Sequence, residues 1–419
     1  MVQKSVLENG MRVITEKIPS AHSVTVGFWV ENGSRHERVS EGGISHFIEH
    51  MLFKGTDRRS ALDIAKEIDS GGGVLNGFTG PEYSCYYAKV LAKKLPQAID
   101  LLSDIVLHSI FDLDEIEKER RVILQEIYMQ EDSPDEQVHD LFSQLFWRGH
   151  PLGKSVLGTR DSVGSLARDQ FLVFLQERYC GRNILVCAAG DLEHQEIVDF
   201  IAEAFQEIPT GGETSPSPLP EYQRRIEFVE KDLEQVHICL GTRAFPQNHP
   251  NRFESYVMNT ILGGSMSSRL FQKIREERGM AYSVYSYLNN HSDAGALVVY
   301  AGTSPEDAPH AVALLLKELK RFATDLVGED ELRSAKEQLR GNLLLSMEST
   351  ENRMTRLAKN EIYMGRNLAL KEVLHGFEKV TREGILKLAE FTLQDEYLNL
   401  QLMGKVREGD FPLLDLTLG

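Results

Sequence analysis

The chain is short of cysteine, of long apolar runs and of positive charge, and each shortage excludes a class of protein. Its four cysteines, Cys85, Cys180, Cys187 and Cys239, form no C-x-x-C pair, which argues against a disulfide framework or a cysteine-bound metal. No apolar run approaches the roughly 18 residues of a membrane-spanning helix. There are 46 Lys and Arg against 63 Asp and Glu, a formal charge of −17, whereas phosphate binding needs concentrated basic residues. We therefore expect no membrane span and no nucleic-acid partner.

The rest of the composition is that of an ordinary soluble globular protein. Hydrophobic residues make up 42% and charged residues 26%, and 419 residues exceed what one hydrophobic core usually supports. The first residues, MVQKSVLENGMRVITEK, lack the apolar core of a signal peptide and predict two strands around a turn at Asn9-Gly10. We therefore expect a reduced, cytoplasmic protein of two or more domains.

The run GGISHFIEHMLFKG contains the pattern H-x-x-E-H, formed by His46, Glu49 and His50. Apolar residues around it recur at helical spacing and predict a buried helix face. They are Ile44, Phe47, Ile48, Met51 and Leu52. In such a helix the two imidazoles lie one turn apart and can share one zinc ion. A pattern this short also arises by chance, and a tetrahedral site with an open water position needs a third protein ligand.

The segment FDLDEIEKERRVILQEIYMQED predicts a long helix that begins near Asp112 or Asp114 and supplies that ligand. Glu119 and Glu126 lie two turns apart on the apolar stripe of this helix. The other members of the stripe are Ile116, Ile123 and Gln130. A buried carboxylate is costly unless it is paired or bound to a cation, so the pattern requires a partner. The remaining charged residues predict a solvated face.

Together these motifs resemble the inverted zinc peptidases of the pitrilysin and insulinase superfamily, in particular the two-domain bacterial relatives of mitochondrial processing peptidase. The resemblance runs through nearly the whole chain. It implies that His46, His50 and Glu126 bind zinc, that Glu49 is the general base on zinc-bound water, and that Glu119 is a second acidic residue needed for activity. Two His and one Glu favour zinc, although spacing alone does not exclude another divalent ion.

The chemistry of these groups fits the implied roles. Zinc lowers the pKa of a bound water toward neutrality, and a neighbouring carboxylate such as Glu49 can pass its proton to the leaving amine. Glu119 is better interpreted as a group that orients a ligand and offsets the metal charge.

The resemblance also covers GGGVLNGFTGPEYSCYY and implies an edge strand that receives the substrate. Peptide would add to this strand through main-chain hydrogen bonds, which tolerate many sequences. The residues expected to contact it are Leu75, Asn76, Gly77, Phe78 and Thr79.

A Pro, Gly and Ser-rich stretch divides the chain into two similar halves. We predict an N-terminal zinc-binding domain over residues 1–210, a linker over 211–223 and a homologous C-terminal domain over 224–419. Each half mixes strands with long helices without strict βαβ alternation, which indicates the α+β class. The resemblance implies the same fold, with a mainly antiparallel sheet packed against helices in each domain.

The second half lacks the metal-binding side chains. DELRSAKEQLRGNLLLSM aligns with DEIEKERRVILQEIYM and places Ala335 and Asn342 where the first half has its two glutamates. SYVMNTILGGS aligns with HFIEHMLFKGT and replaces the H-x-x-E-H residues with Ser255, Met258 and Asn259. We therefore expect one zinc ion per chain.

The second half keeps one distinctive pair, Arg275 and Tyr282. The resemblance implies that they position the scissile peptide and stabilise the oxyanion, which suits a fixed cation and a phenol donor. The alternative is an ion pair and a core tyrosine. In the family this pair faces the metal domain of the opposite half of a four-domain chamber, so we expect a homodimer in which the pair acts in trans.

The sequence therefore predicts a zinc metalloendopeptidase that cleaves peptides or unfolded segments inside a clamshell chamber. The alternative is a non-catalytic or partner-dependent binding subunit of the same fold. Such relatives usually lose H-x-x-E-H, which is intact here. The sequence does not identify the substrate or its cleavage specificity.

Overall fold

The computed structural model describes residues 1–212, 218–411 and 416–418, and these form two compact units. Unit 1 comprises residues 1–129, 154–216 and 345–367, and unit 2 comprises residues 130–153, 217–344 and 368–419. Part of the predicted linker, residues 213–217, lies outside the described residues. No helix in the described part of the chain has both the length and the apolar character to cross a membrane.

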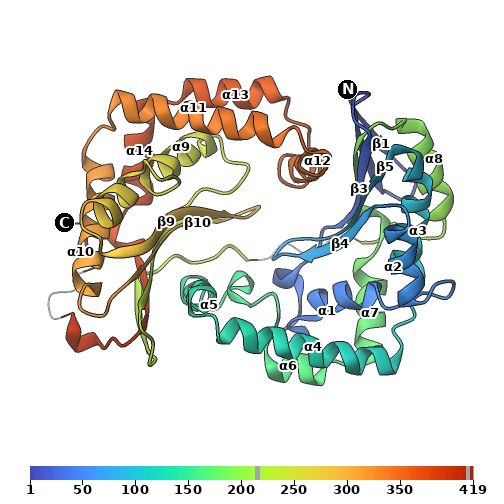
Figure 1. Cartoon of the computed structure of the whole chain (residues 1–419), viewed down its shortest axis with the longest axis horizontal. Helices are drawn as coiled ribbons and strands as arrows, with labels where there is room; N and C mark the ends of the chain where they lie inside the picture. Colours follow the sequence, from blue (N-terminus) through green and yellow to red (C-terminus); the bar gives the residue numbers. More distant parts are fainter. Residues whose placement is uncertain (213–217, 412–415, 419) are drawn as a thin grey trace. The chain divides into compact units, whose positions relative to one another are not determined.

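Unit 1 contains a six-stranded sheet in the order β1-β2-β6-β3-β5-β4. Strands β1, β3, β4 and β5 are labelled in Figure 1. β2 and β6 pair in parallel and all other neighbours pair antiparallel. The strands are β1 Val2–Val6, β2 Arg12–Lys17, β3 Ser23–Val30, β4 Val74–Thr79, β5 Ser84–Leu91 and β6 Ile184–Gly190. The predicted N-terminal hairpin is confirmed: β1 and β2 pair across a turn in which Gly10 has φ +87°. β4 forms one edge of the sheet.

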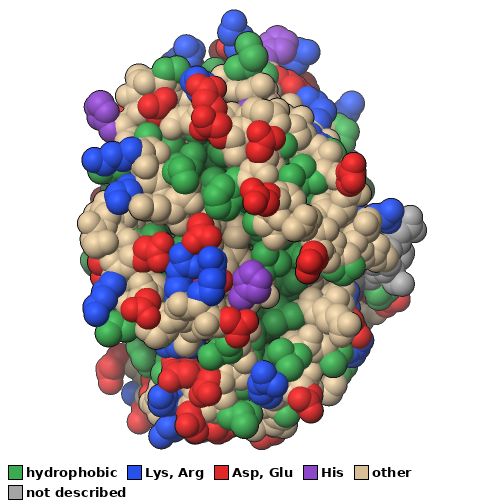
Figure 2. Space-filling view, turned by 90° about the vertical axis from the view of Figure 1, so that its right-hand side faces the viewer, with side chains coloured by type: hydrophobic (Ala, Val, Ile, Leu, Met, Phe, Trp, Pro, Cys, Tyr) green, Lys and Arg blue, Asp and Glu red, His purple; other side chains and the backbone are tan. Residues whose placement is uncertain are grey.

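One face of this sheet packs against helices that come mainly from the first half of the sequence. They are α1 Ile44–Leu52, α2 Ala61–Asp69, α3 Leu95–His108, α4 Leu113–Glu131, α6 Arg160–Ser165, α7 Arg168–Arg178 and α8 His194–Ala204. The core between sheet and helices includes Phe28 of β3, Phe47 of α1 and Leu102 of α3, all fully buried. Figure 2 shows the outer face that carries α2, α3 and α8, where acidic and basic side chains are interspersed.

The other face of the unit 1 sheet is covered by α12, Thr350–Met364, which comes from the second half of the sequence. Met354 and Leu357 pack in a buried cluster with Trp29 of β3. Gly27 makes room for this helix, because a Cβ there would lie 2.9 Å from the Met354 sulfur. The carboxylate of Glu361 pairs with Lys4 Nζ at 2.7 Å and ties the helix to β1.

Unit 2 repeats the same topology in five strands, in the order β7-β11-β8-β10-β9. The strands are β7 Arg225–Glu230, β8 Val236–Ala244, β9 Ala281–Asn290, β10 Gly295–Thr303 and β11 Asn399–Gly404. β7 and β11 are parallel, as β2 and β6 are. β6 and β11 each end in a glycine of unusual conformation, Gly190 with φ +143° and Gly404 with φ +142°. The predicted α+β fold of two homologous domains is confirmed.

The unit 2 sheet also takes one helix from the opposite half of the sequence. α5, Pro134–Phe146, packs on β8 and β11 through residues such as Val138 and Phe142. The other helices of this unit are α9 Arg252–Leu262, α10 Ala308–Thr324, α11 Glu329–Ser346, α13 Leu370–Lys379 and α14 Arg382–Thr392.

The compact units therefore differ from the predicted contiguous domains, 1–210 and 224–419, in residues 130–153 and 345–367. Each unit takes one helical segment from the other half of the chain. The amphipathic pattern of a helix shows that one face is buried but does not show which sheet buries it. A boundary placed from composition alone cannot detect such an exchange.

Candidate metal centre

The helix α1 presents the H-x-x-E-H side chains, and its predicted buried stripe is confirmed, with all five apolar residues at most 1% exposed. Gly43 precedes the helix with φ +88°, and a Cβ there would lie 2.5 Å from the Leu157 carbonyl oxygen. The buried carboxylate of Glu37 accepts hydrogen bonds from the main-chain N–H groups of Gly43 and Ser45, both at 2.9 Å. The helix dipole stabilises a negative charge at the N-terminal end of α1. Burial nevertheless raises the pKa of Glu37 to about 7.

The helix α4 begins after Asp112, which was one of the two predicted starts. Its Oδ1 atom accepts hydrogen bonds from the main-chain N–H groups two and three residues further on, at 2.9 and 3.1 Å. Ile116, Glu119 and Ile123 are buried along one face, at 2%, 5% and 0% exposure. Glu126 lies further along the same stripe, with its side chain 37% exposed. The predicted inward-facing stripe is confirmed for Ile116, Glu119 and Ile123, whereas Glu126 is partly exposed and only its Oε2 atom is buried.

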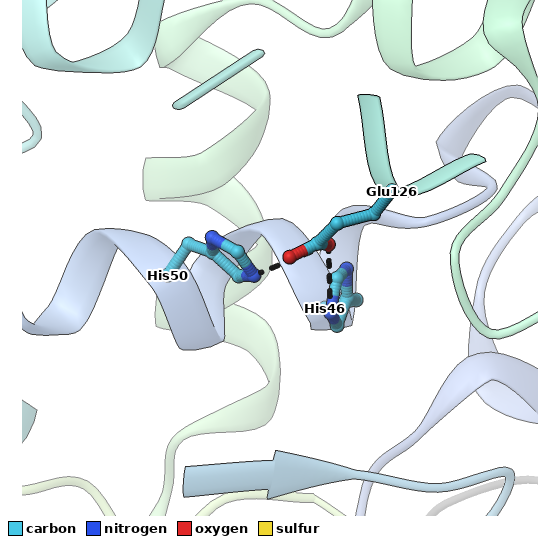
Figure 3. A group of neighbouring side chains, drawn as sticks. All are labelled: His46, His50 and Glu126. Carbon is cyan, nitrogen blue, oxygen red and sulfur yellow. Dashed lines mark ion pairs between the residues drawn. The ribbon is translucent and has the colours of Figure 1, made fainter. Parts of the chain in front are cut away.

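His46, His50 and Glu126 converge on one point (Figure 3). Glu126 Oε2 lies 3.8 Å from His46 Nε2 and 3.6 Å from His50 Nε2, too far for hydrogen bonds. Ligands about 2.1 Å from a tetrahedral zinc ion lie roughly 3.4 Å apart, close to these separations. Glu126 Oε2 and His46 Nδ1 are buried and have no hydrogen-bond partner among the described residues. The three side chains therefore fit a zinc ion.

The electrostatics of the site also suit metal binding. Burial, followed by repulsion from His50, lowers the pKa of His46 to about 4. The imidazole is therefore neutral at physiological pH, the form in which histidine binds zinc.

Glu49 lies on α1 between the two histidines, and its carboxylate is hydrogen-bonded to β4. Thr79 Oγ1 donates a hydrogen bond to Glu49 Oε2 at 2.6 Å. Gly77 leaves room for this carboxylate, because a Cβ there would lie 3.1 Å from Glu49 Cγ. Burial raises the pKa of Glu49, although the Thr79 hydrogen bond and His50 lower it. A raised carboxylate pKa suits a group that takes up a proton near neutral pH.

Glu119 lies behind His50 instead of in the group of three. Its Oε2 atom is 3.0 Å from His50 Nδ1, and its Oε1 atom is 2.7 Å from Lys54 Nζ. A hydrogen bond to a carboxylate from the ring nitrogen that faces away from the metal fixes the tautomer and orientation of a ligating histidine. This geometry matches the role expected of Glu119.

The strand expected to receive substrate, β4, pairs with β5 on one side and forms the sheet edge on the other. Leu75 packs against the helical core, and Phe78 packs with Trp29 on the opposite face. The Asn76 side-chain oxygen accepts a hydrogen bond from the Gly77 N–H at 2.9 Å. The predicted substrate contacts of this strand stay predictions.

Arg275 and Tyr282 lie together in unit 2, Arg275 in the π-helix Phe271–Glu276 and Tyr282 at the start of the edge strand β9. Arg275 Nη1 donates to the Tyr282 carbonyl oxygen at 2.7 Å, and its guanidinium carbon lies 4.8 Å from the centre of the tyrosine ring. Tyr282 is 78% exposed, so it is no core tyrosine. The pair belongs to unit 2 and the candidate ligands to unit 1. Its action in trans stays a prediction.

The aligned positions of unit 2 carry no comparable group. Met258 and Ala335 are buried in the apolar core, and Asn259 Oδ1 accepts a hydrogen bond from Ser286 Oγ at 2.8 Å. Among the described residues, His46, His50 and Glu126 are the one set of His, Cys, Asp or Glu side chains spaced to hold a metal ion.

Two contacts of the site are not predicted from the sequence. Thr79 is expected to bind substrate, whereas its hydroxyl also donates to Glu49. The contact of Lys54 with Glu119 is also new, although Lys54 follows His50 by four residues, a spacing that places two side chains on the same side of a helix.

Two family models match the chain over most of its length. The model described as insulinase (peptidase family M16) matches residues 12–160, and the peptidase M16 inactive domain matches residues 165–339. An uncharacterized zinc protease of Bacillus subtilis is 38% identical over 397 residues, covering 95% of this chain and 97% of the relative. An uncharacterized zinc protease of Mycobacterium tuberculosis H37Rv is 40% identical over 400 residues, covering 94% of this chain and 91% of the relative.

Solved structures share the fold at low sequence identity. The peptidase M16 inactive domain from Pseudomonas fluorescens has a TM-score of 0.91 and 18% identity, covering 97% of this chain and 98% of that one. A protease from Helicobacter pylori has a TM-score of 0.89 and 20% identity, covering 96% and 99%. A chain of complex III2 from Candida albicans has a TM-score of 0.86 and 21% identity, covering 97% of both chains.

Proposed function

The chain belongs to peptidase family M16, the insulinase family, and from that premise we propose that it is a zinc-dependent endopeptidase that hydrolyses peptides or unfolded segments. One observation carries the proposal. Glu126 Oε2 is buried without a hydrogen-bond partner among the described residues, and it faces the Nε2 atoms of His46 and His50. Such a group is costly to bury unless it binds a cation.

His46, His50 and Glu126 would hold one zinc ion, which would act as a Lewis acid toward a water molecule and a peptide carbonyl. Glu49 would accept the proton of the attacking water and deliver it to the leaving amine. Thr79 holds that carboxylate by its hydrogen bond, and Glu119 orients His50. Arg275 and Tyr282 would donate to the developing oxyanion.

The substrate would add to β4 as a further strand. An edge strand offers main-chain groups that bind any peptide sequence, so specificity would come from side-chain pockets. The residues of this proposed contact are those predicted above, from Leu75 to Thr79.

We further propose a homodimer that works in the cytoplasm, with Arg275 and Tyr282 acting on the metal centre of the partner. The ligands and the Arg-Tyr pair lie in different units, so a second copy can supply the pair. All four cysteines are free and buried, as expected in a reducing compartment.

A non-catalytic subunit of the same fold is the second candidate function. The likeness to a chain of complex III2 shows the shared fold, and such a role would not require metal ligands. The convergence of the three candidate ligands favours the enzyme.

The test compares Glu49→Gln with Glu117→Gln. Glu117 is an exposed glutamate of α4 that pairs with Arg120. Glu49→Gln should keep one zinc per chain and lose about 10³-fold in peptide turnover, because the proton acceptor is gone. Glu117→Gln should match the wild type in both. Zinc is measured by metal analysis after dialysis and turnover with a quenched fluorescent peptide library. A wild-type chain without zinc and without chelator-sensitive cleavage contradicts the proposal.

A further inference from the structure

Lys54 connects the end of the metal helix to the carboxylate behind His50. α1 ends at Leu52, and Lys54 Nζ lies 2.7 Å from Glu119 Oε1 while the other oxygen of Glu119 faces His50 Nδ1 at 3.0 Å. Glu119 is 5% exposed. One buried carboxylate thus divides its two oxygens between a candidate zinc ligand and a lysine from the same segment of the chain.

We propose that Lys54 is a positioning residue of the metal centre, acting through Glu119 on His50. The inference rests on the proposed zinc-peptidase function. The lysine compensates a buried negative charge and fixes the orientation of the Glu119 carboxylate relative to the imidazole. His50 Nδ1 then keeps its hydrogen bond, and Nε2 is held toward Glu126.

Without the lysine, Oε1 of Glu119 loses its charged partner in a buried position. The carboxylate could then rotate about its side-chain torsions to seek another donor, and the hydrogen bond to His50 would no longer have one preferred geometry. A ligand held in several orientations binds a metal more weakly than a preorganised one, and loss of such supporting contacts typically costs about 10- to 100-fold in metal affinity.

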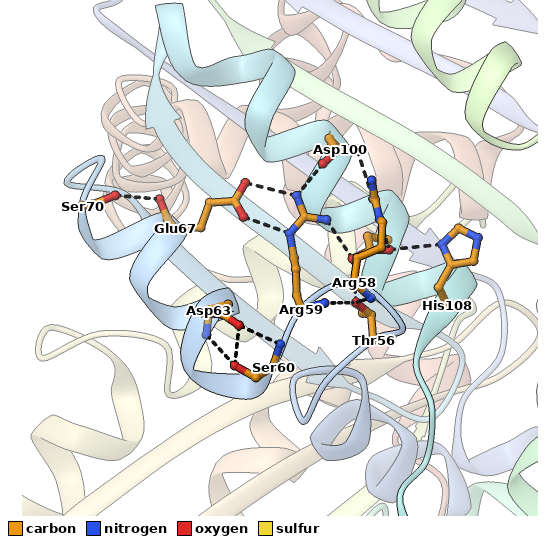
Figure 4. Close-up of polar contacts among 10 residues, drawn as sticks. Thr56, Arg58, Arg59, Ser60, Asp63, Glu67, Ser70, Asp100 and His108 are labelled. Carbon is orange, nitrogen blue, oxygen red and sulfur yellow. Dashed lines mark hydrogen bonds and ion pairs between the residues drawn. The ribbon is translucent and has the colours of Figure 1, made fainter.

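The loop that carries Lys54 is fastened to α3, where Asp104 accepts its hydrogen bonds. Figure 4 shows Thr56, Arg58 and Arg59 of this loop. Thr56 Oγ1 and Arg59 Nη1 both donate to Asp104 Oδ2 at 2.7 Å, and Arg58 Nε donates to Oδ1 at 3.0 Å. Asp104 is fully buried. Burial works to raise its pKa, but the hydrogen bonds from Arg59, Thr56 and Arg58 outweigh it, and the pKa of Asp104 is lowered. An ionised carboxylate therefore anchors the loop two residues after Lys54.

The backbone at Gly55 lets the loop turn between Lys54 and this anchor. Gly55 has φ +130°, a conformation that side chains rarely allow, and its carbonyl oxygen accepts a hydrogen bond from Ile110 N at 3.2 Å. The main chain of Lys54 is thus held between the end of α1 and the Asp104 anchor. Lys54 therefore contacts Glu119 from a main-chain position that is held in place.

The test measures zinc affinity of the full chain by competition with a chromophoric chelator. Lys54→Met removes the charge and keeps the length of the side chain, and we expect about 10-fold weaker zinc binding. Lys54→Arg, which keeps a cation, should stay within about 3-fold of the wild type. The matched control is Lys118→Met on α4, whose lysine pairs with the partly exposed Glu115 instead, and it should bind zinc as the wild type does.

A double-variant cycle separates positioning from general stability. If Lys54 acts through Glu119, Lys54→Met should have no further effect on zinc affinity in a Glu119→Gln chain. In a Trp147→Phe background, emission of the buried Trp29 reports whether unit 1 is folded. Should Lys54→Met alone fail to fold, the comparison of Glu119→Gln with the double variant decides, because the double variant removes both charges and the lysine left in Glu119→Gln is partly exposed to water.

Two results would overturn the inference: wild-type zinc affinity in Lys54→Met, or a double variant that binds zinc more weakly than Glu119→Gln. Failure of the underlying function is a different outcome, because the wild-type chain itself would then bind no zinc in the same assay.

Discussion

Units 1 and 2 share five strands in the same order, with β1 added in unit 1, and they differ in the side chains that their helices carry. In unit 1, α1 and α4 bring two histidines and two glutamates together, whereas at the aligned positions of unit 2 the residues are Ser255, Asn259, Ala335 and Asn342. The same pair of helices thus occurs in both units, as α1 and α4 and as α9 and α11. The fold by itself therefore does not make a metal site. A few side chains on a shared frame decide which copy can bind an ion.

The difference also shows how each copy balances its charges. Glu119 is buried in unit 1 with His50 and Lys54 as partners, and the aligned Ala335 is buried in unit 2 without needing any. An apolar replacement is tolerated because removing all the charged groups together leaves none unpaired.

The largest expected effect comes from replacing each of two aligned residues, Glu126 and Asn342, by alanine. Glu126→Ala should abolish stoichiometric zinc binding and lower peptide turnover by more than about 10³-fold, since a ligand is lost. Asn342→Ala at the aligned position of α11 should leave zinc content and turnover unchanged. Equal losses in the two variants, measured by metal analysis and peptide cleavage, would contradict the assignment of the site to unit 1 alone.

The second prediction tests whether the two units cooperate between chains. Arg275→Ala should lower turnover by about 100-fold without changing zinc content, because oxyanion stabilisation is lost. Mixing this variant with Glu49→Gln chains should restore part of the wild-type rate, since one of the two sites in a mixed dimer would be complete. A mixture no more active than the sum of its components would show that the pair does not act in trans.

The smallest expected effect concerns acid stability of unit 2. Burial lowers the pKa of His139 to about 4, and its ring nitrogens lie 2.8 and 2.9 Å from the hydroxyls of Tyr287 and Tyr285. The folded imidazole stays neutral while the unfolded one takes up a proton below about pH 6.5. Unit 2 should therefore lose stability as the pH falls from about 6.5 toward 4, by at most about 3 kcal/mol from this group, and keep it above that range.

The chain has two tryptophans, and each reports on one unit: Trp29 on unit 1 and Trp147 on unit 2. Urea unfolding of a Trp29→Phe chain therefore follows unit 2 through Trp147. His139→Gln should flatten the acid dependence of that transition, with His237 retaining part of it, because burial lowers the pKa of His237 too. An unchanged slope would show that His139 is not the group responsible.

Much of the site could be predicted from the sequence because its residues lie on two strongly periodic helices. The stripes around His46 and Glu126 predicted which faces of α1 and α4 are buried, and the structure confirms both. The exchange of α5 and α12 between units could not be predicted, because it depends on which sheet accepts each helix. The contacts of Lys54 with Glu119 and of Thr79 with Glu49 join segments far apart in the sequence, so the periodicity of a single segment does not predict the partner.

The central claim is that one zinc ion is bound by two imidazoles and a carboxylate of unit 1. Zinc-edge X-ray absorption of the full chain loaded with one equivalent of zinc tests it most directly. The account predicts a shell of nitrogen and oxygen atoms at about 2.0–2.2 Å with the scattering pattern of two imidazoles, and loss of that pattern in a His46→Ala, His50→Ala chain. Sulfur at about 2.3 Å, or an unchanged spectrum in the double variant, would contradict it.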